Sequence, residues 1–191
     1  VNKGCGVELM TDPRRAGRIV RAMREAGGVP VSAKLRLGAD AVRLDSVADA
    51  LLEAGVDALA VHGRTARQKY DGRADWEPVV ALASRSPVPV IGSGDVTDAA
   101  QARARMAQGV GVMVGRGALG RPWLFAEVAR GDVPSTADKV RTMVRHAELH
   151  VAWYGREAGL RSLRGHLANY AKGVDATGRL RDEVVRVHTV P

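Results

Sequence analysis

The chain has 191 residues, of which 46% are hydrophobic and 26% are charged, and its formal net charge is +8 at pH 7. This composition excludes an intrinsically disordered chain. No apolar run reaches the about 20 residues that cross a bilayer, so we expect no membrane segment. The single cysteine, Cys5, excludes an internal disulfide and a cysteine zinc cluster. We therefore expect a reducing, cytoplasmic setting and no metal site.

Basic side chains are concentrated toward the C-terminus. Residues 139–191 hold ten Lys and Arg against five Asp and Glu, together with four of the five histidines. These histidines are His146, His150, His166 and His188. The charge favours a polyanionic partner such as a nucleic acid. A solvated helical face in an arginine-rich protein is the alternative, and charge alone leaves both open.

Short apolar runs alternate with helical patterns in the first part of the chain, which predicts parallel βα units. Each run is almost continuously apolar, as in strands that are buried on both faces of a parallel sheet. The predicted strands cover 31–35, 58–62, 88–92 and 111–115. The predicted helices cover 12–26, 45–54, 76–84, 97–107 and 122–130, the first beginning at Asp12-Pro13 and the fourth at Thr97-Asp98.

Four βα units correspond to half of a barrel that takes about 250 residues for eight units. We therefore predict an α/β fold, in which the second half of a TIM (β/α)8 barrel is followed by an all-α helical domain. The strand signals stop after Pro134. Helices are expected at 137–155, 160–172 and 179–187. The predicted domains are residues 1–133 and 134–191, with a linker at 130–134.

Two features suggest that the chain belongs with more sequence than is printed. It begins with Val1 rather than Met and opens directly into a motif-like stretch. A half barrel also has two open edges and a half-exposed core. We expect the first half of the barrel to precede Val1, or the open edges to be covered by self-association.

The carboxyl ends of the predicted strands carry polar residues, where βα barrels place their function. Lys34 lies inside the first strand, which favours a binding role over a snorkelling lysine. The second strand ends in His62-Gly63-Arg64-Thr65, which supplies a donor, a tight turn and a cation. Alone this motif is weak, because His62 could equally be a core histidine.

Glycine-rich segments follow the third and fourth strands. Ser93-Gly94-Asp95 allows a ligand close to the backbone, although Asp95 could instead cap the next helix. Residues 115–120 spell G-x-G-x-x-G, but no further strand follows, so a dinucleotide-binding βαβ unit is not favoured. A phosphate site after a late barrel strand fits better, with Gly115 offering its N–H and Arg116 its charge. Together these features predict a flavin mononucleotide (FMN) pocket.

These motifs, in their order and spacing, resemble the tRNA-dihydrouridine synthases, in the branch sometimes described as nitrogen-regulation-like. The resemblance rests on six strings spread over about 125 residues and on two strings in the helical tail. They are VNKGCG at 1–6, KLRLG at 34–38, VHGRT at 61–65, YDGRADW at 70–76, GD at 94–95, VGRGALGRPWLF at 114–125, LRGHL at 163–167 and YAKG at 170–173.

The resemblance implies an enzyme that uses FMN and NADPH to reduce the C5–C6 double bond of a uridine flipped out of tRNA. Residues implied to hold the flavin are Lys34, His62, Ser93, Gly94, Asp95, Gly115 and Arg116. Residues implied to face the tRNA are Arg64, Lys69 and Tyr70, together with the basic tail that includes Arg164 and Lys172. The family usually has Asn where Ser93 stands, which puts one amide contact in doubt.

The same resemblance implies that Cys5 is not the catalytic acid. The acid cysteine of the family lies in a Met-Gly-Cys-Pro loop before the Val-Asn-Lys segment, upstream of Val1, so no catalytic residue is assigned here. Two other functions remain open. One is another FMN-dependent barrel oxidoreductase of the dihydroorotate dehydrogenase type, which the basic tail disfavours. The other is a truncated, non-catalytic RNA-binding module.

Overall fold

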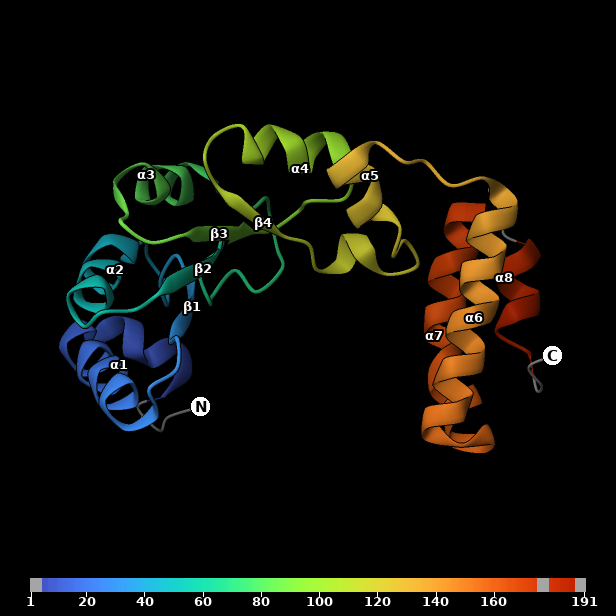
Figure 1. Ribbon diagram of the computed structural model, residues 1–191, viewed down its shortest axis with the longest axis horizontal. Coiled ribbons are helices and arrows are strands. Elements are labelled where there is room, and N and C mark those ends of the chain that lie inside the picture. Colours follow the sequence, from blue (N-terminus) through green and yellow to red (C-terminus); the bar gives the residue numbers. More distant parts are fainter. Residues whose placement is uncertain (1–4, 175–178, 188–191) are drawn as a thin grey trace. The chain divides into compact units, whose positions relative to one another are not determined.

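The computed structural model of the chain describes residues 5–174 and 179–187. Four parallel strands form one sheet in the order β1-β2-β3-β4 (Figure 1), which confirms the four predicted strands to within a few residues. The strands are β1 (Ser32–Arg36), β2 (Ala58–His62), β3 (Val90–Ser93) and β4 (Gly111–Met113). The predicted α/β class, with a parallel sheet and intervening helices, is therefore confirmed.

Helices connect these strands and continue after the last of them. Those of the strand-containing part are η1 (Gly6–Thr11), α1 (Pro13–Gly27), α2 (Leu44–Glu53), α3 (Glu77–Arg85) and α4 (Ala99–Met106). The later ones are η2 (Arg116–Ala118), α5 (Leu124–Arg130), α6 (Thr136–Tyr154), α7 (Arg156–Val174) and α8 (Arg179–Val184). No helix within the described ranges has the length and apolarity that crossing a membrane requires.

The chain forms two compact units, Val1–Gly115 and Arg116–Pro191. The predicted domain limit lies later, between residues 133 and 134. The structure groups residues 116–130 with the helices because this segment packs on α7: a Cβ at Gly120 would lie 2.4 Å from the backbone carbon of Asn169, and the rings of Trp123 and Tyr170 are 6.0 Å apart.

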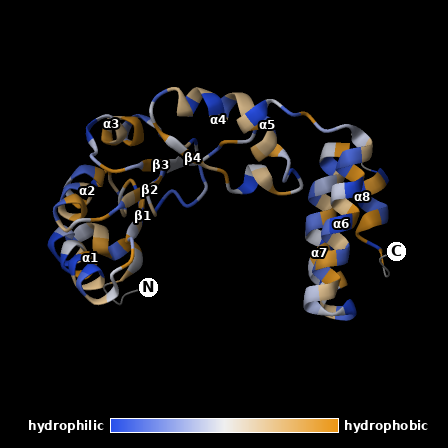
Figure 2. Cartoon of the chain, in the orientation of Figure 1, coloured by the Kyte–Doolittle hydropathy of each residue, from blue (hydrophilic) through white to orange (hydrophobic). Residues whose placement is uncertain are grey.

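The core of the first unit lies between one face of the sheet and helices α1 to α4. Leu59 and Val61 of β2 are fully buried, and so are Val79 and Leu82 of α3. Helix α2 buries Leu44, Val47, Ala48 and Leu51, the spacing of a helix with one apolar face. Hydrophobic and hydrophilic residues accordingly alternate around α1 and α2 (Figure 2).

The other face of the sheet is only partly covered. Along β1, β2 and β3 the residues that alternate with the buried ones are half-buried or exposed, and Met113 of β4 is 39% exposed. The four strands are therefore not buried on both faces in the described residues, and the core is half-exposed, as expected for four βα units.

Side-chain caps mark the starts of α1 and α4, as predicted. Asp12 accepts a hydrogen bond from the N–H of Arg15, and Asp98 accepts one from that of Gln101, as expected for N-caps. Helix α7 begins at 156, before the expected residue 160. It starts directly after Gly155, and Gly159 lets it pack closely on Val151 of α6.

Helices α6, α7 and α8 share a small apolar core. It contains Ala147 of α6, Leu163, Leu167 and Ala171 of α7 and Val184 of α8, with Met143 and Leu180 at its edge. Helix α6 has a reciprocal cap in which the Ser135 hydroxyl accepts from the Asp138 N–H and the Asp138 carboxylate accepts from the Ser135 N–H.

We expect Gly92→Ala to destabilise the first unit, because an added Cβ would lie 2.3 Å from Cζ3 of the buried Trp76. Overpacking of this kind costs about 1–3 kcal/mol in the free energy of unfolding. Denaturant unfolding followed by circular dichroism measures it. Gly115→Ala is the matched control, since an added Cβ there meets nothing within 4 Å. Equal stabilities of the two variants would contradict the packing described.

Candidate functional site at the carboxyl ends of the strands

Arg36, His62 and Ser93 lie in one row across the sheet. His62 and Ser93 were predicted as site residues, and Arg36 is close to the predicted Lys34 on β1. The strand register pairs Arg36 with His62 and His62 with Ser93, at the carboxyl ends of β1, β2 and β3. Lys34 lies two residues earlier on β1 and shares its face with Arg36. The place of Lys34 inside an apolar strand suggested a buried side chain, but the side chain is exposed. An exposed ammonium is available to an anion.

The loop after β2 crosses the strand ends and is held there by Arg64. This residue is only 1% exposed, the most deeply buried cation of the described residues. Its Nη2 donates to both carboxylate oxygens of Asp95, at 2.9 and 2.7 Å, and to the carbonyl of Gly72 at 2.6 Å. Its Nε donates to the carbonyl of Asp71 at 3.1 Å. Arg64 therefore fastens this loop to the segment after β3.

Arg36 provides a second attachment for the same loop. Its Nη1 donates to the carbonyls of Thr65, at 2.9 Å, and of Lys69, at 3.1 Å. Trp76, at the far end of the loop, donates from its indole N–H to the carbonyl of Gly94. Arg36 is a site residue that the sequence motifs did not indicate. Its alternation with Lys34 on one strand was the available signal.

His62 is neutral in this environment. Burial, followed by the positive charges of Arg36, Arg64 and Lys34, lowers the pKa of its imidazole from 6.5 to about 4, although Asp95 opposes this. Arg64 Nη1 lies 3.4 Å from His62 Nε2. Because a guanidinium only donates, Nε2 must accept, and the proton of the neutral ring is on Nδ1. The site thus offers an uncharged N–H donor beside two cations.

The glycines at the strand ends have different roles. Gly94 has φ of +127°, and a Cβ there would lie 2.5 Å from the Cβ of Ala74 and 3.3 Å from Cδ2 of His62. Only glycine fits this close approach. Gly115, by contrast, has open space around it. Arg116 follows it directly and begins η2 in the second unit.

Of the residues predicted to face RNA, some are exposed and others are buried or half-buried. Tyr70 is 62% exposed, and Lys69 and Lys172 are also exposed. Arg164 is half-buried, with its Nε buried and without a hydrogen-bond partner. Arg64 needs a correction: its guanidinium is enclosed by Asp71, Gly72 and Asp95 and does not face solvent.

Cys5 is exposed and lies just before η1. In the sequence it is far from the residues at the carboxyl ends of the strands. Among the described residues no group of three or more His, Cys, Asp or Glu side chains has the arrangement of a metal site.

With this fold and site, the chain belongs to the dihydrouridine synthase (Dus) family, whose family model matches residues 1–190. Individual relatives agree. A probable tRNA-dihydrouridine synthase of Rhodobacter capsulatus is 38% identical over 207 residues, which cover 97% of this chain and 63% of that protein. One from Mycobacterium leprae is 40% identical, with 98% and 53% covered. The tRNA-dihydrouridine synthase B of Xanthomonas axonopodis pv. citri is 37% identical, with 98% and 60% covered.

The chain therefore spans between about half and two thirds of the length of these relatives. The resemblance seen in the sequence motifs is confirmed at the level of the family.

We expect Arg64→Ala to lower the free energy of unfolding by about 2–3 kcal/mol, because it removes charge-assisted hydrogen bonds from a buried cation to a carboxylate and two carbonyls. Arg85→Ala is the control. Its ion pairs with Asp45 and Asp49 are exposed, and such pairs contribute about 0–1 kcal/mol. A double-mutant cycle with Asp95→Ala isolates the pair. A coupling energy of zero would contradict the role given to it.

We expect the His62 imidazole to titrate near pH 4 in the folded chain. Since the pKa is lower in the folded state than in the unfolded state, the unfolded state binds the extra proton between about pH 6.5 and pH 4. Stability from this group is full above pH 6.5 and is lost as the pH falls toward 4. NMR titration of the histidine ring protons, assigned by comparison with His62→Gln, measures it. A midpoint at 6.5 would contradict the environment described.

Proposed function

We propose that the chain is the flavin- and RNA-binding portion of a tRNA-dihydrouridine synthase, which reduces a uridine in tRNA. The single observation that carries this proposal is the family match along residues 1–190, together with relatives that bear this name. Since the chain spans only part of those relatives, the activity is proposed for the whole enzyme.

In this proposal the sheet β1-β2-β3-β4 is the second half of a (β/α)8 barrel. The consecutive order of the parallel strands, each joined to the next through a helix, and the partly uncovered sheet face support it. The strand-containing unit Val1–Gly115 would be the barrel half, the helices within 134–191 would form the tRNA-binding domain, and residues 116–130, which pack on α7, would join the two. Self-association through the two sheet edges, and a cytoplasmic location, stay predictions.

The residues at the strand ends are suited to FMN. The exposed Lys34 ammonium would stabilise negative charge on the reduced ring, and the neutral His62 would donate from Nδ1. Ser93 and Gly94 would approach the ribityl chain, and the open backbone at Gly115, with Arg116, would receive the phosphate. The Asp95 carboxylate is already bound to Arg64 and Ala74, so its contribution would be to position the loop.

Bound FMN, reduced by NADPH, would supply the hydride that the uridine C6 position accepts. The chain's own residues would hold this chemistry in place. Lys34 and His62 would orient the ring, and the loop fastened by Arg64 and Arg36 would cover it. The proton for C5 would come from a cysteine acid other than Cys5. Lys69, Tyr70, Arg164 and Lys172 would contact the tRNA backbone.

A second function is favoured by one specific observation. Cys5 is the single cysteine of the chain. If the acid cysteine must come from elsewhere, the 191-residue chain by itself would bind RNA without reducing it.

We expect the purified chain to carry the visible absorbance of oxidised flavin, and Lys34→Ala to weaken FMN binding about tenfold, as for one charge-assisted hydrogen bond. Spectroscopic titration with FMN measures the affinity, and Arg85→Ala serves as a surface-charge control. Dihydrouridine formation in an unmodified tRNA transcript with NADPH tests the activity. A colourless chain that still shifts tRNA on a gel supports the non-catalytic alternative. A chain that binds neither overturns both.

A further inference from the structure

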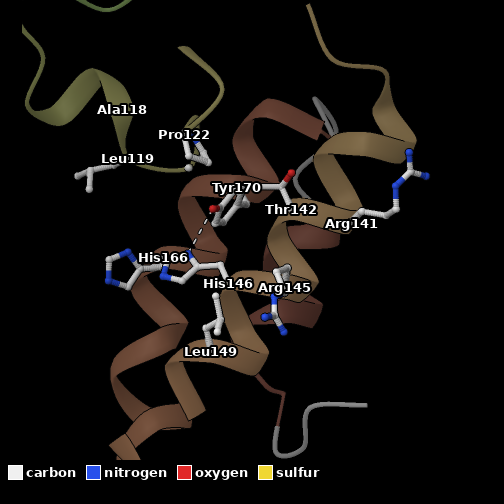
Figure 3. A pocket seen from close by; sticks show the side chains of 11 residues that line it. Ala118, Leu119, Pro122, Arg141, Thr142, Arg145, His146, Leu149, His166 and Tyr170 are labelled. Carbon is white, nitrogen blue, oxygen red and sulfur yellow. Dashed lines mark hydrogen bonds between the residues drawn. The ribbon is translucent and has the colours of Figure 1, made fainter. Parts of the chain in front are cut away.

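Within the second unit, a hollow of about 690 Å³ lies between the segment after β4 and the helices α6 and α7. One wall is formed by Leu119 and Pro122, and the opposite wall by the imidazoles of His146 and His166, with Tyr170 at its end (Figure 3). Hollows of a few hundred Å³ that combine apolar walls and a few polar groups are typical ligand sites. The function proposed above uses none of these residues.

The residues that line this hollow are spaced so that they lie on one face of each helix. His166 and Tyr170 are four residues apart on α7, and Arg141, Arg145 and Leu149 follow each other at the same spacing on α6, so each set lies on one helix face. Gly120 lets the opposite wall approach, because its φ is +71° and a Cβ would overlap the α7 backbone at Asn169.

The rings are held in fixed positions. Tyr170 Oη lies 3.2 Å from His146 Nδ1, and the His146 and His166 rings are in edge contact with centroids 5.1 Å apart. His150, which does not line the hollow, is hydrogen-bonded to Ser162 at 2.8 Å. Fixed aromatic rings opposite an aliphatic wall form a slot for a flat group.

Charge lies at the rim rather than in the slot. Arg145 is paired with Glu148 at 3.2 Å, and Arg141 is paired with Asp138 and extends away from the imidazoles (Figure 3). Burial, and then the neighbouring His166 and His150, lower the pKa of the His146 imidazole. An aromatic and aliphatic slot with cations at its margin fits a neutral base whose flanking phosphates lie outside.

We propose that this hollow holds one unstacked base of a single-stranded RNA segment. The inference rests on the proposed function, which supplies RNA as the partner, and it adds a site and a mode of binding. The base would stack on the imidazoles of His146 and His166 and contact Leu119, while the adjacent phosphates would lie toward Arg145. The excess of basic residues in 139–191 provides the complementary charge.

This site lies on a different face of α7 from the predicted RNA contacts. At 100° per residue, Arg164 and Lys172 are directed away from His166 and Tyr170. The two placements of RNA on α7 therefore make different predictions for mutation.

The test uses a short oligouridylate with one 4-thiouridine, and binding is followed by fluorescence anisotropy. We expect His166→Ala to weaken binding about tenfold, the loss typical of one base–aromatic stack. Leu119→Ala, on the opposite wall, should weaken it in the same direction. Phe125→Ala is the control, which removes an exposed aromatic ring that does not line the hollow and should change the affinity less than twofold. Circular dichroism verifies that each variant is folded.

Photo-cross-linking then locates the base. Cross-links to the peptides that contain His146, His166 or Tyr170 support the inference. RNA binding with cross-links only around Arg164 and Lys172, and no effect of His166→Ala, overturns it and leaves the proposed function intact. Absence of any RNA binding overturns both. If uridine monophosphate binds as tightly as the oligonucleotide, the inference is overturned, because the hollow then holds a free nucleotide and not an RNA strand.

Discussion

The buried guanidinium of Arg64 is the interaction on which the candidate site depends. It joins the loop after β2 to Asp95 after β3, through contacts of 2.6 to 3.1 Å to Asp71, Gly72 and the Asp95 carboxylate. A cation removed from water needs such partners. If the loop left the strand ends, the guanidinium would be exposed or would lose its hydrogen-bond partners. Arg64, together with Arg36, which donates to the carbonyls of Thr65 and Lys69, holds the loop and with it Lys69 and Tyr70 in position.

The same cation contributes to the chemistry of its neighbour. Burial first, and then the positive charges of Arg36 and Arg64, lower the pKa of the His62 imidazole, so the ring stays neutral, and the contact with Arg64 places its proton on Nδ1. Two different groups therefore lie at the strand ends. Lys34 supplies a positive charge, and His62 supplies an uncharged hydrogen-bond donor. This division is suited to a ligand that combines an anionic locus with a carbonyl or ring nitrogen.

The sheet face that carries these groups is also the face that lacks a complete covering layer. Ala60 and Ile91 are half-buried and Met113 is exposed on this face, whereas parallel sheets are usually covered on both faces. The polar groups of the candidate site therefore lie on the less covered face of the sheet.

Sequence alone determined the order and limits of most elements, because continuous apolar runs and caps such as Asp12 and Asp98 act locally. It also indicated His62, Gly94 and Lys34 as site residues, through their places at strand ends. Tertiary structure decided what each side chain does. The burial of Arg64, the part played by Arg36 and the grouping of residues 116–130 with α7 all depend on contacts between segments far apart in the chain. A motif specifies which groups are present, whereas only packing decides whether a cation faces RNA or fastens a loop.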